Sequence, residues 1–383
     1  MNASGGAGRD ARRRLAALLA EIEQADDALE LFARASERLR SIVPFDAAVW
    51  RATDPLTGMM THPVRVENLG EDGCSVYWEE ELLTENVNLF SDLARAKVPT
   101  ATLHGSTGGL PDRSTLYRAF LRPRGLNDEL RAVARADGNP WGQISLFRAR
   151  ESPVFGADDT RVVQRVSAAL ARRLRSFAEP RLDGDPAPSS GPEPGLLHFA
   201  PSGALVSFND AAHQYLTELA EAGGGEPDTG NALRMAIPAW IHSTVSKARA
   251  IASGRDRGSA RVRVRGRHGR WLVCHASCLR TVDGEPGASV VVIEPASISE
   301  VAPLMVRAYR LTDRELEITQ HIARGLGTAE IGDRLYISPH TVRDHIKSIF
   351  EKTHVASRGE LVAKLFTEHY APLSEGREQR ILD

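Results

Sequence analysis

The sequence predicts a multidomain protein that consists of two α+β modules followed by an all-α bundle of four short helices. Four helical patterns follow one another between Leu311 and Phe366, with capping residues at nearly every start. Upstream, strand-like alternation and helical periodicity are mixed in two blocks, a pattern typical of α+β domains. A proline-rich segment at 179–195 separates the two blocks. A chain of 383 residues is long enough for two to three domains.

The C-terminal bundle is delimited by its capping residues. Thr312, with a glutamate three residues later, has the spacing of a capping box, so the first helix is expected to begin there and to end at Gly325. A second, short helix is expected to start at Thr328. Ser338 then caps a third helix, in which Pro339 occupies the first position.

The third helix has two faces, because successive side chains are rotated by about 100°. Its apolar residues fall on one side and are expected to point inward: Val342, Ile346, Ile349 and Phe350. The opposite side carries long polar and charged residues: His340, Arg343, Asp344, Lys347 and Glu351. Such a face on the N-terminal turns is what a recognition helix presents to base edges in the major groove.

The fourth helix begins at a second capping box, formed by Ser357 and Glu360. An apolar stripe follows on one of its faces: Leu361, Val362, Leu365 and Phe366. We interpret this stripe as the dimerisation surface, since an apolar stripe requires a partner.

The charge of the bundle leaves a second interpretation open. Positions 311–371 contain 8 Lys and Arg against 9 Asp and Glu, and the whole chain has a net charge of −2. A DNA-binding domain is expected to be basic, and short amphipathic helices also occur in many other helical bundles. DNA binding must therefore depend on a few placed cations, with docking on protein as the alternative.

The bundle resembles the LuxR-type helix-turn-helix of bacterial transcription regulators. The motifs that carry the resemblance are LTDRE at 311–315, IARG at 322–325, ISPHTV at 337–342 and SRGEL at 357–361. The resemblance implies that exposed residues of the third helix contact bases and that Lys352 contacts backbone phosphate. The predicted DNA-binding set is Ser338, His340, Thr341, Arg343, Asp344, Lys347 and Lys352. Asp344 departs from the neutral or basic residues usual in this family. A carboxylate accepts from cytosine N4 but repels phosphate, so the base sequence that this helix reads stays open.

The first module, residues 1–178, is predicted to be an α+β domain with an N-terminal helix. Helices are expected at 12–39, broken near Asp26, at 79–98 and at 158–177, with a glycine-rich loop at 105–109. Strands are expected at 45–53, 59–66, 129–136 and 143–148. The sequence DPLTG at 54–58 indicates the turn that joins the first two strands.

Turn and core motifs of this module are similar to those of the GAF-type domain in a group of actinobacterial LuxR-type regulators. They are PFDAA at 44–48, DPLTG at 54–58, NDELR at 127–131 and WG at 141–142. The resemblance implies a small-molecule pocket between the sheet and its helices. Trp50, Trp78 and Trp141 are the candidates to line such a pocket; the preferred alternative is that they are ordinary core residues.

Residues 196–298 are predicted to form the second α+β module, after the linker at 179–195. Strands at 195–199 and 205–208 precede helices at 209–222 and 235–252, and antiparallel strands follow at 260–264, 270–279 and 289–295. This order is that of a PAS domain, and Leu205–Ala212 resembles its strand-to-helix entry. A helix-turn-helix domain at 303–371 and a tail at 372–383 complete the chain.

Two features of the second module suggest additional sites. Alternating arginines, Arg261, Arg263, Arg265 and Arg267, give one strand face a positive charge that suits an anionic ligand or a DNA backbone. A solvated face of a half-buried strand is the preferred interpretation. Cys274 and Cys278 share a strand face from which His275 points away, which disfavours a zinc site.

The sequence shows little sign of a catalytic or cofactor site. Neither a phosphate-binding loop nor a nucleophile elbow occurs, so we predict that the chain is not an enzyme and that it holds no metal or cofactor. Three cysteines, Cys74, Cys274 and Cys278, do not suit a disulfide framework and indicate a reducing compartment. No stretch approaches the ~20 apolar residues of a membrane span, and the apolar run at 15–20 is too short for a signal peptide.

We therefore interpret the chain as a cytoplasmic, homodimeric transcription regulator that binds double-stranded DNA. Its N-terminal modules are expected to respond to a small-molecule effector or a protein signal. The alternative is a sensor or enzymatic protein whose C-terminal bundle is a protein-interaction module. The sequence leaves open the effector, the operator and whether transcription is activated or repressed.

Overall fold

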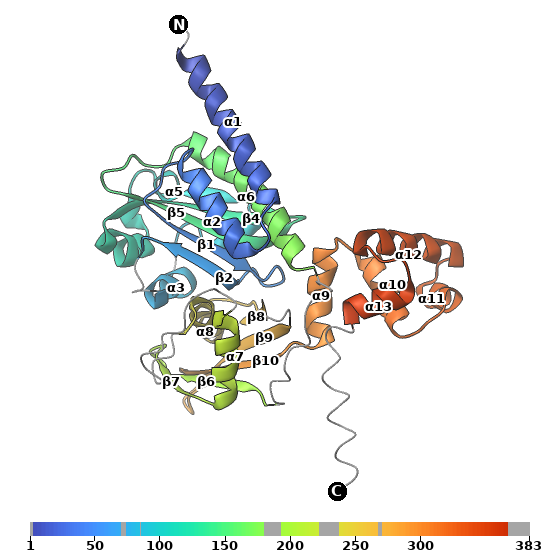
Figure 1. Cartoon of the computed structure of the whole chain (residues 1–383). Helices are drawn as coiled ribbons and strands as arrows, with labels where there is room; N and C mark the ends of the chain where they lie inside the picture. The colour runs from blue at the N-terminus through green and yellow to red at the C-terminus, as the bar shows by residue number, and fades with distance from the viewer. Residues whose placement is uncertain are drawn as a thin grey trace.

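The computed structural model describes residues 3–69, 74–84, 86–179, 193–221, 237–266 and 270–366. The chain forms two antiparallel five-stranded sheets and a helical C-terminal part (Figure 1). Most of the predicted linker at 179–195 and all of the predicted tail at 372–383 lie outside the described residues. Within the described ranges, no helix is both long enough and apolar enough to cross a membrane.

The first module has helices on both faces of its sheet. The helices are α1 (Ala3–Glu23), α2 (Ala28–Arg40), α3 (Cys74–Leu83), α4 (Phe90–Arg95), α5 (Leu103–Thr107) and α6 (Ala157–Phe177), with short turns of helix at η1 (Pro111–Arg113), η2 (Tyr117–Leu121) and η3 (Arg122–Arg124). The strands are β1 (Ala47–Thr53), β2 (Met60–Glu67), β3 (Thr100–Thr102), β4 (Leu126–Ala136) and β5 (Asn139–Ala149), in the order β2-β1-β5-β4-β3. The predicted break near Asp26 is confirmed, because Asp27 accepts a hydrogen bond from Glu30 N and starts α2.

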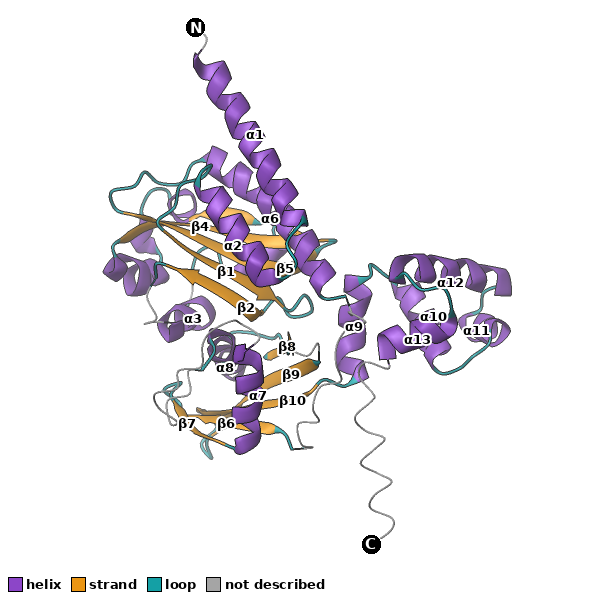
Figure 2. Cartoon of the chain, in the orientation of Figure 1, coloured by secondary structure: helices purple, strands orange, loops and turns teal. Residues whose placement is uncertain are grey.

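Strand β1 is buried along its whole length because its side chains alternate between two apolar layers. Ala48, Trp50 and Ala52 belong to the layer formed with α1, α2 and α6 (Figure 2). Ala47 and Val49 belong to the layer formed with α3, α4 and α5. The two faces of this sheet therefore contact different helices.

Two predictions for the segment between β2 and β4 are wrong. The helix expected at 79–98 is interrupted, since α3 ends before α4 begins and Asn88 between them has φ 59°. The glycine-rich loop expected at 105–109 overlaps α5, because Thr102 accepts a hydrogen bond from Gly105 N and starts a helical turn. Gly108 ends that turn at φ 66°, a conformation that glycine adopts without strain.

The second module repeats the strand order of the first. Its strands are β6 (Gly195–Phe199), β7 (Leu205–Phe208), β8 (Arg261–Arg265), β9 (Trp271–Arg280) and β10 (Pro286–Pro295), all antiparallel in the order β7-β6-β10-β9-β8. Helices α7 (Asp210–Glu221) and α8 (Ala239–Ala252) pack against this sheet (Figure 2). The predicted succession of two strands, helices and three strands is confirmed.

The arginines of β8, Arg261, Arg263 and Arg265, do not form a solvated sheet face, so the preferred interpretation is wrong for them. The fourth predicted arginine, Arg267, lies outside the described residues. Arg263 is only 9% exposed and pairs with Asp54, in the turn after β1, at 2.9 Å. Arg265 donates to the carbonyl oxygen of Phe177 at 2.9 Å. Strand β8 therefore lies between the two modules, and its cations bind acidic and carbonyl groups of the chain itself.

The C-terminal part contains one helix more than the sequence predicted. The helices are α9 (Ile298–Ala308), α10 (Asp313–Ala323), α11 (Thr328–Leu335), α12 (Pro339–Thr353) and α13 (Arg358–Phe366). Helices α10 to α13 are the four expected ones. Helix α9 was not predicted, and it lies between the two modules and the other C-terminal helices (Figure 1). Its residues Val301, Leu304 and Met305 are buried.

Candidate functional site

The starts of α10 and α12 have the hydrogen bonds that the sequence predicted. At the start of α13, Ser357 Oγ accepts from Glu360 N, but the Glu360 carboxylate accepts from Ala356 N. Thr312 Oγ1 accepts from Glu315 N at 3.2 Å, and the Glu315 carboxylate accepts from Thr312 N at 2.7 Å. Ser338 Oγ accepts from Thr341 N at 3.1 Å and starts α12, with Pro339 as its first residue. These caps satisfy backbone N–H groups that have no partner within the helix, and they define where α10 and α12 begin.

The turn between α11 and α12 is held by a close backbone approach. Helix α11 ends at Tyr336, with φ 54°, and Ile337 N then donates to Gly332 O at 3.0 Å. A Cβ atom on Gly332 would lie 2.7 Å from the carbonyl oxygen of Ile337. Glycine at 332 therefore permits the short connection that sets α12 against α11.

Arginines that the sequence did not single out connect the ends of these helices. Arg314 donates to the carbonyl oxygen of Leu335, at the end of α11, at 2.6 Å. Arg358 donates to the carbonyl oxygen of Leu326 at 2.8 Å and to Thr328 Oγ1 at 2.7 Å. Their partners are 21 to 32 residues away in the chain, so no local pattern reveals them.

Helix α12 separates its two faces as predicted. Val342, Ile346 and Ile349 are buried in the bundle. On the opposite face the side chains of His340, Asp344 and Lys347 are 79%, 68% and 80% exposed, and Arg343 is also exposed.

The charges on this exposed face are partly compensated within the helix. His340 Nδ1 lies 3.0 Å from Asp344 Oδ2, and Lys347 Nζ lies 4.0 Å from Glu351 Oε1. Both contacts are between exposed residues four positions apart and are therefore weak. No ion pair or hydrogen bond joins the Arg343 side chain to any described residue. The exposed face thus presents the guanidinium of Arg343, which has no partner among the described residues, and the weakly paired ammonium of Lys347.

Sequence comparison assigns these helices to a family. Residues 309–365 match the family described as GerE, bacterial regulatory proteins, luxR family. Residues 309–365 therefore form a luxR-family helix-turn-helix domain, and α9 precedes it. The LuxR-type resemblance of the bundle is thereby confirmed, and the domain covers a small part of the chain.

Curated relatives of the chain are transcription regulators that match it over short segments. The nitrate/nitrite response regulator protein homolog of Haemophilus influenzae is 44% identical over 48 residues, which cover 12% of this chain and 23% of that protein. The transcriptional regulatory protein DesR of Bacillus subtilis is 41% identical over 61 residues, 16% of this chain and 31% of that protein. The chain therefore spans less than a third of the length of these relatives.

Solved structures give broad but weak similarity. A crystal structure of Escherichia coli SdiA aligns with 93% of this chain and 96% of that chain, at 12% identity and a TM-score of 0.34. The VqmA–ligand–DNA complex from Vibrio cholera aligns with 47% of this chain and 84% of that chain, at 18% identity and a TM-score of 0.21. These scores carry no argument about the two upstream modules.

Lys352 of the luxR-family domain has an intramolecular partner. Its ammonium lies 2.9 and 2.7 Å from the two carboxylate oxygens of Glu315, and its side chain is 33% exposed. Burial raises the pKa of Glu315, but hydrogen bonds from Lys352, Ser348 and Thr312 outweigh burial and lower the pKa to about 2. This ion pair joins α12 to α10, so the Lys352 ammonium has a partner within the chain in this structure.

The apolar stripe on α13 is not free to form a dimer surface at its first residue. Leu361 is fully buried in the luxR-family domain, where α13 contacts α10 and α9, and Val362 is partly buried against the same core. The Leu361 side chain is therefore not exposed for the predicted dimer contact, because its partner comes from the same chain. The side chains of the predicted residues Leu365 and Phe366 lie outside the described part.

The three tryptophans proposed for a ligand pocket do not come together. Trp50 and Trp141 lie in the apolar layer shared with α6, at 0% and 3% exposed. Trp78, on α3, lies in the layer across the sheet. In the described part of the first module, Trp78 is thus separated from Trp50 and Trp141 by the sheet.

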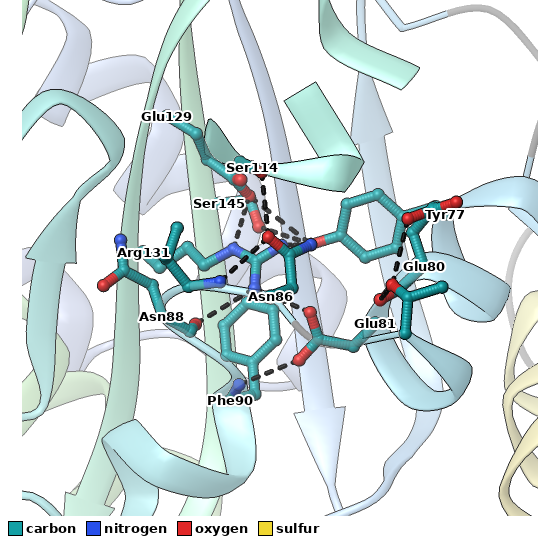
Figure 3. Close-up of polar contacts among 12 residues, drawn as sticks. Tyr77, Glu80, Glu81, Asn86, Asn88, Phe90, Ser114, Glu129, Arg131 and Ser145 are labelled. Carbon is teal, nitrogen blue, oxygen red and sulfur yellow. Dashed lines mark hydrogen bonds and ion pairs between the residues drawn. The ribbon is translucent and has the colours of Figure 1, made fainter. Parts of the chain in front are cut away.

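A buried polar cluster, unpredicted from the sequence, occupies the layer that contains Trp78 (Figure 3). At its centre the Arg131 guanidinium donates to Glu81 Oε2 at 2.6 Å and pairs with Glu129 at 2.9 Å. It also donates to Tyr77 Oη at 2.9 Å and to the carbonyl oxygen of Asn88 at 3.0 Å. The side chains of the three ionic residues are 2–4% exposed, so the single guanidinium of Arg131 faces two carboxylates inside the protein.

This cluster fixes α3 and α4 on the sheet. Glu81, on α3, accepts from Phe90 N at the start of α4 at 2.8 Å while it also holds Arg131 on β4. Burial raises the pKa of Tyr77 to about 12, so its hydroxyl stays protonated. The sequence signal for this cluster was the spacing of Glu129 and Arg131, two charged residues that share one face of a predicted strand.

Proposed function

We propose that the chain is a sequence-specific DNA-binding transcription regulator that reads duplex DNA with the N-terminal turns of α12. The exposed, uncommitted guanidinium of Arg343 carries this proposal, since arginine is the residue that most often makes bidentate contacts with guanine in the major groove. Lys347 lies one turn further along the same face. The weak pairing of its ammonium with Glu351 is readily replaced by a contact with base or phosphate.

We assign the other predicted residues according to their place on α12. Ser338, His340 and Thr341 lie at the exposed start of the helix, where hydroxyl and imidazole groups reach phosphate or base edges. Asp344 contributes specificity by accepting from cytosine N4. Lys352 contributes only after its ion pair with Glu315 opens.

The two upstream modules act as sensors in this proposal. Their common strand order and their mixture of sheet and helices support a GAF-like first module and a PAS-like second module. A small-molecule or protein signal in either module shifts the balance between arrangements that suit or do not suit the operator. The regulator acts as a homodimer, so that two recognition helices meet successive major grooves ~34 Å apart.

The experiment is a selection of genomic DNA fragments by the full chain, followed by binding titrations at several salt concentrations. We expect a negative slope of log affinity against log salt concentration. Arg343→Ala and Lys347→Ala each weaken binding to the selected site by roughly 1–3 kcal/mol where a base contact is lost. Lys97→Ala, which removes an exposed cation of the first module, is the matched control and leaves binding unchanged.

One observation favours a different function for the bundle. The charges of its exposed face are partly self-compensated and the domain is not basic, which also suits docking on another protein. If no genomic fragment is enriched, or if binding does not depend on salt, the regulator proposal is wrong and protein docking becomes the better explanation.

A further inference from the structure

Three parts of the chain meet at the side chain of Arg263. Its guanidinium donates to Asp54 of the first module at 2.9 Å and to the Glu300 carboxylate of α9 at 2.7 Å. Its Nε donates to the carbonyl oxygen of Glu300 at 2.6 Å, and its backbone N–H donates to Asp54 at 3.0 Å. The Asp54 side chain is fully buried.

A cavity of about 170 Å³ lies beside these ion pairs; we call it the junction cavity. The first module contributes Ala52, Trp141 and Leu174 to its wall, the second contributes Trp271 and α9 contributes Leu304. Aromatic rings and aliphatic groups thus form much of the wall, and all three parts of the chain are represented.

One residue of this wall, Trp141, has a buried polar atom without a partner among the described residues. Trp141 is 3% exposed, and its indole Nε1 is buried without a hydrogen-bond partner among the described residues. Buried polar groups are almost always hydrogen-bonded, because leaving a donor unpaired in an apolar environment is costly. An acceptor supplied by a bound molecule would satisfy this donor.

The size and charge of the junction cavity restrict that molecule. A cavity of ~150 Å³ with apolar walls holds one benzene ring, so the junction cavity suits a single ring with a small substituent. The ionic groups at its wall already have partners, since Arg263 pairs with Asp54 and Glu300, and Arg265 donates to the carbonyl oxygens of Phe177 and Glu179. A charged molecule would bury an uncompensated charge there, so a neutral one is favoured.

We propose that the junction cavity is a binding site for a neutral, monocyclic molecule whose oxygen accepts a hydrogen bond from Trp141 Nε1. The site differs from the polar cluster around Arg131, which lies on the other face of the first sheet. Binding is independent of the DNA-binding proposal and is measured without DNA. Because the two modules and α9 all contribute to the wall, occupancy changes how tightly these three parts pack.

The test compares two probes of similar size on the full chain by saturation-transfer NMR titration. Benzamide has a ring and a carbonyl oxygen, whereas toluene has a ring and no acceptor. We expect saturable binding of both to the natural sequence. Trp141→Phe keeps an aromatic ring but removes the donor, so benzamide should bind about fivefold more weakly, as expected for one hydrogen bond, while toluene should bind unchanged.

A second pair of variants fills the junction cavity. Ala52→Leu places a larger side chain in its wall and should weaken binding of both probes at least tenfold, while the thermal unfolding temperature shows that the protein is folded. Ala28→Leu, at the start of α2, repeats the test from another side of the cavity if Ala52→Leu does not fold. The proposal is overturned if benzamide does not bind the natural sequence, if folded filled variants bind it as well as the natural sequence does, or if Trp141→Phe affects both probes equally.

Discussion

Replacing Glu315 with glutamine removes the charge that joins α10 to α12 in the luxR-family domain. The carboxylate holds Lys352 at 2.7 and 2.9 Å, Ser348 at 2.6 Å and the backbone N–H of Thr312 at 2.7 Å. These bonds lower its pKa from 4.5 to about 2, although burial acts in the opposite direction. A difference of that size corresponds to about 3 kcal/mol of stability at neutral pH.

The pH dependence of this contribution follows from the direction of the shift. Because the pKa of Glu315 is lower in the folded chain than its ordinary value of 4.5, the ionised carboxylate stabilises the fold above about pH 4.5. The contribution is lost as the pH falls through about 2. We therefore expect Glu315→Gln to cost about 2–3 kcal/mol at pH 7 and about 1 kcal/mol at pH 3.

The assay is amide hydrogen exchange of α10 and α12 in the full chain, corrected for intrinsic exchange rates, at pH 7 and pH 3. Exchange reports the free energy of opening of these helices separately from the rest of the protein. Glu317→Gln is the control, since its ion pair with Arg314 at 2.7 Å is largely exposed and should contribute less than about 1 kcal/mol. Equal effects of Glu315→Gln at both pH values would show that ionisation of this carboxylate is not what stabilises the domain.

Three further predictions concern single residues. Leu361→Ala should destabilise the luxR-family domain by about 2–4 kcal/mol, measured by hydrogen exchange. If the variant instead dissociates a dimer without loss of stability, Leu361 is an interface residue. Arg131→Met should lower the unfolding free energy of the first module by about 3–5 kcal/mol in guanidinium titrations followed by tryptophan fluorescence, because it leaves two buried carboxylates unpaired; an unchanged midpoint would contradict this. Gly332→Ala should cost about 1–3 kcal/mol by the same exchange assay, because the new Cβ atom meets the Ile337 carbonyl oxygen at 2.7 Å. Gly359→Ala, whose Cβ atom would have only an ordinary contact at 3.9 Å, should be neutral or stabilising.

Features set by neighbouring residues were predictable from the sequence. The capping hydrogen bonds at Thr312 and Ser338 connect residues three positions apart, and the helix faces of α12 follow from a single rotation per residue. All strands of the two sheets except β3 were recognised for the same reason, since alternation and turn residues are local signals. The three residues of β3 are too few to show an alternation. One local prediction was wrong: the loop expected around Gly105 overlaps α5, because the cap at Thr102 starts a helix despite the glycines.

Features set by distant partners were not predictable. Asp54 and Arg263 are 209 positions apart, so the sequence around β8 does not show that its arginines have acidic partners within the chain. Leu361 looked like an interface residue because its covering helices, α9 and α10, could not be inferred from its own helix. The separation of Trp50 from Trp78 also depends on which helix covers which face of a sheet.

Helix α9 also has a mechanical property that follows from its length. Glu300 near its start pairs with Arg263, and Tyr309 just after its end lies 5.5 Å from the Lys364 ammonium of α13. Its 11 residues form a rod of about 16 Å at 1.5 Å per residue. A pivot of roughly 10° at Glu300 displaces the far end of such a rod by about 3 Å. In the proposed dimer, opposite displacements in the two protomers change the spacing of the recognition helices by up to about 6 Å out of ~34 Å. A small rotation where the modules meet therefore prevents both recognition helices from fitting successive major grooves.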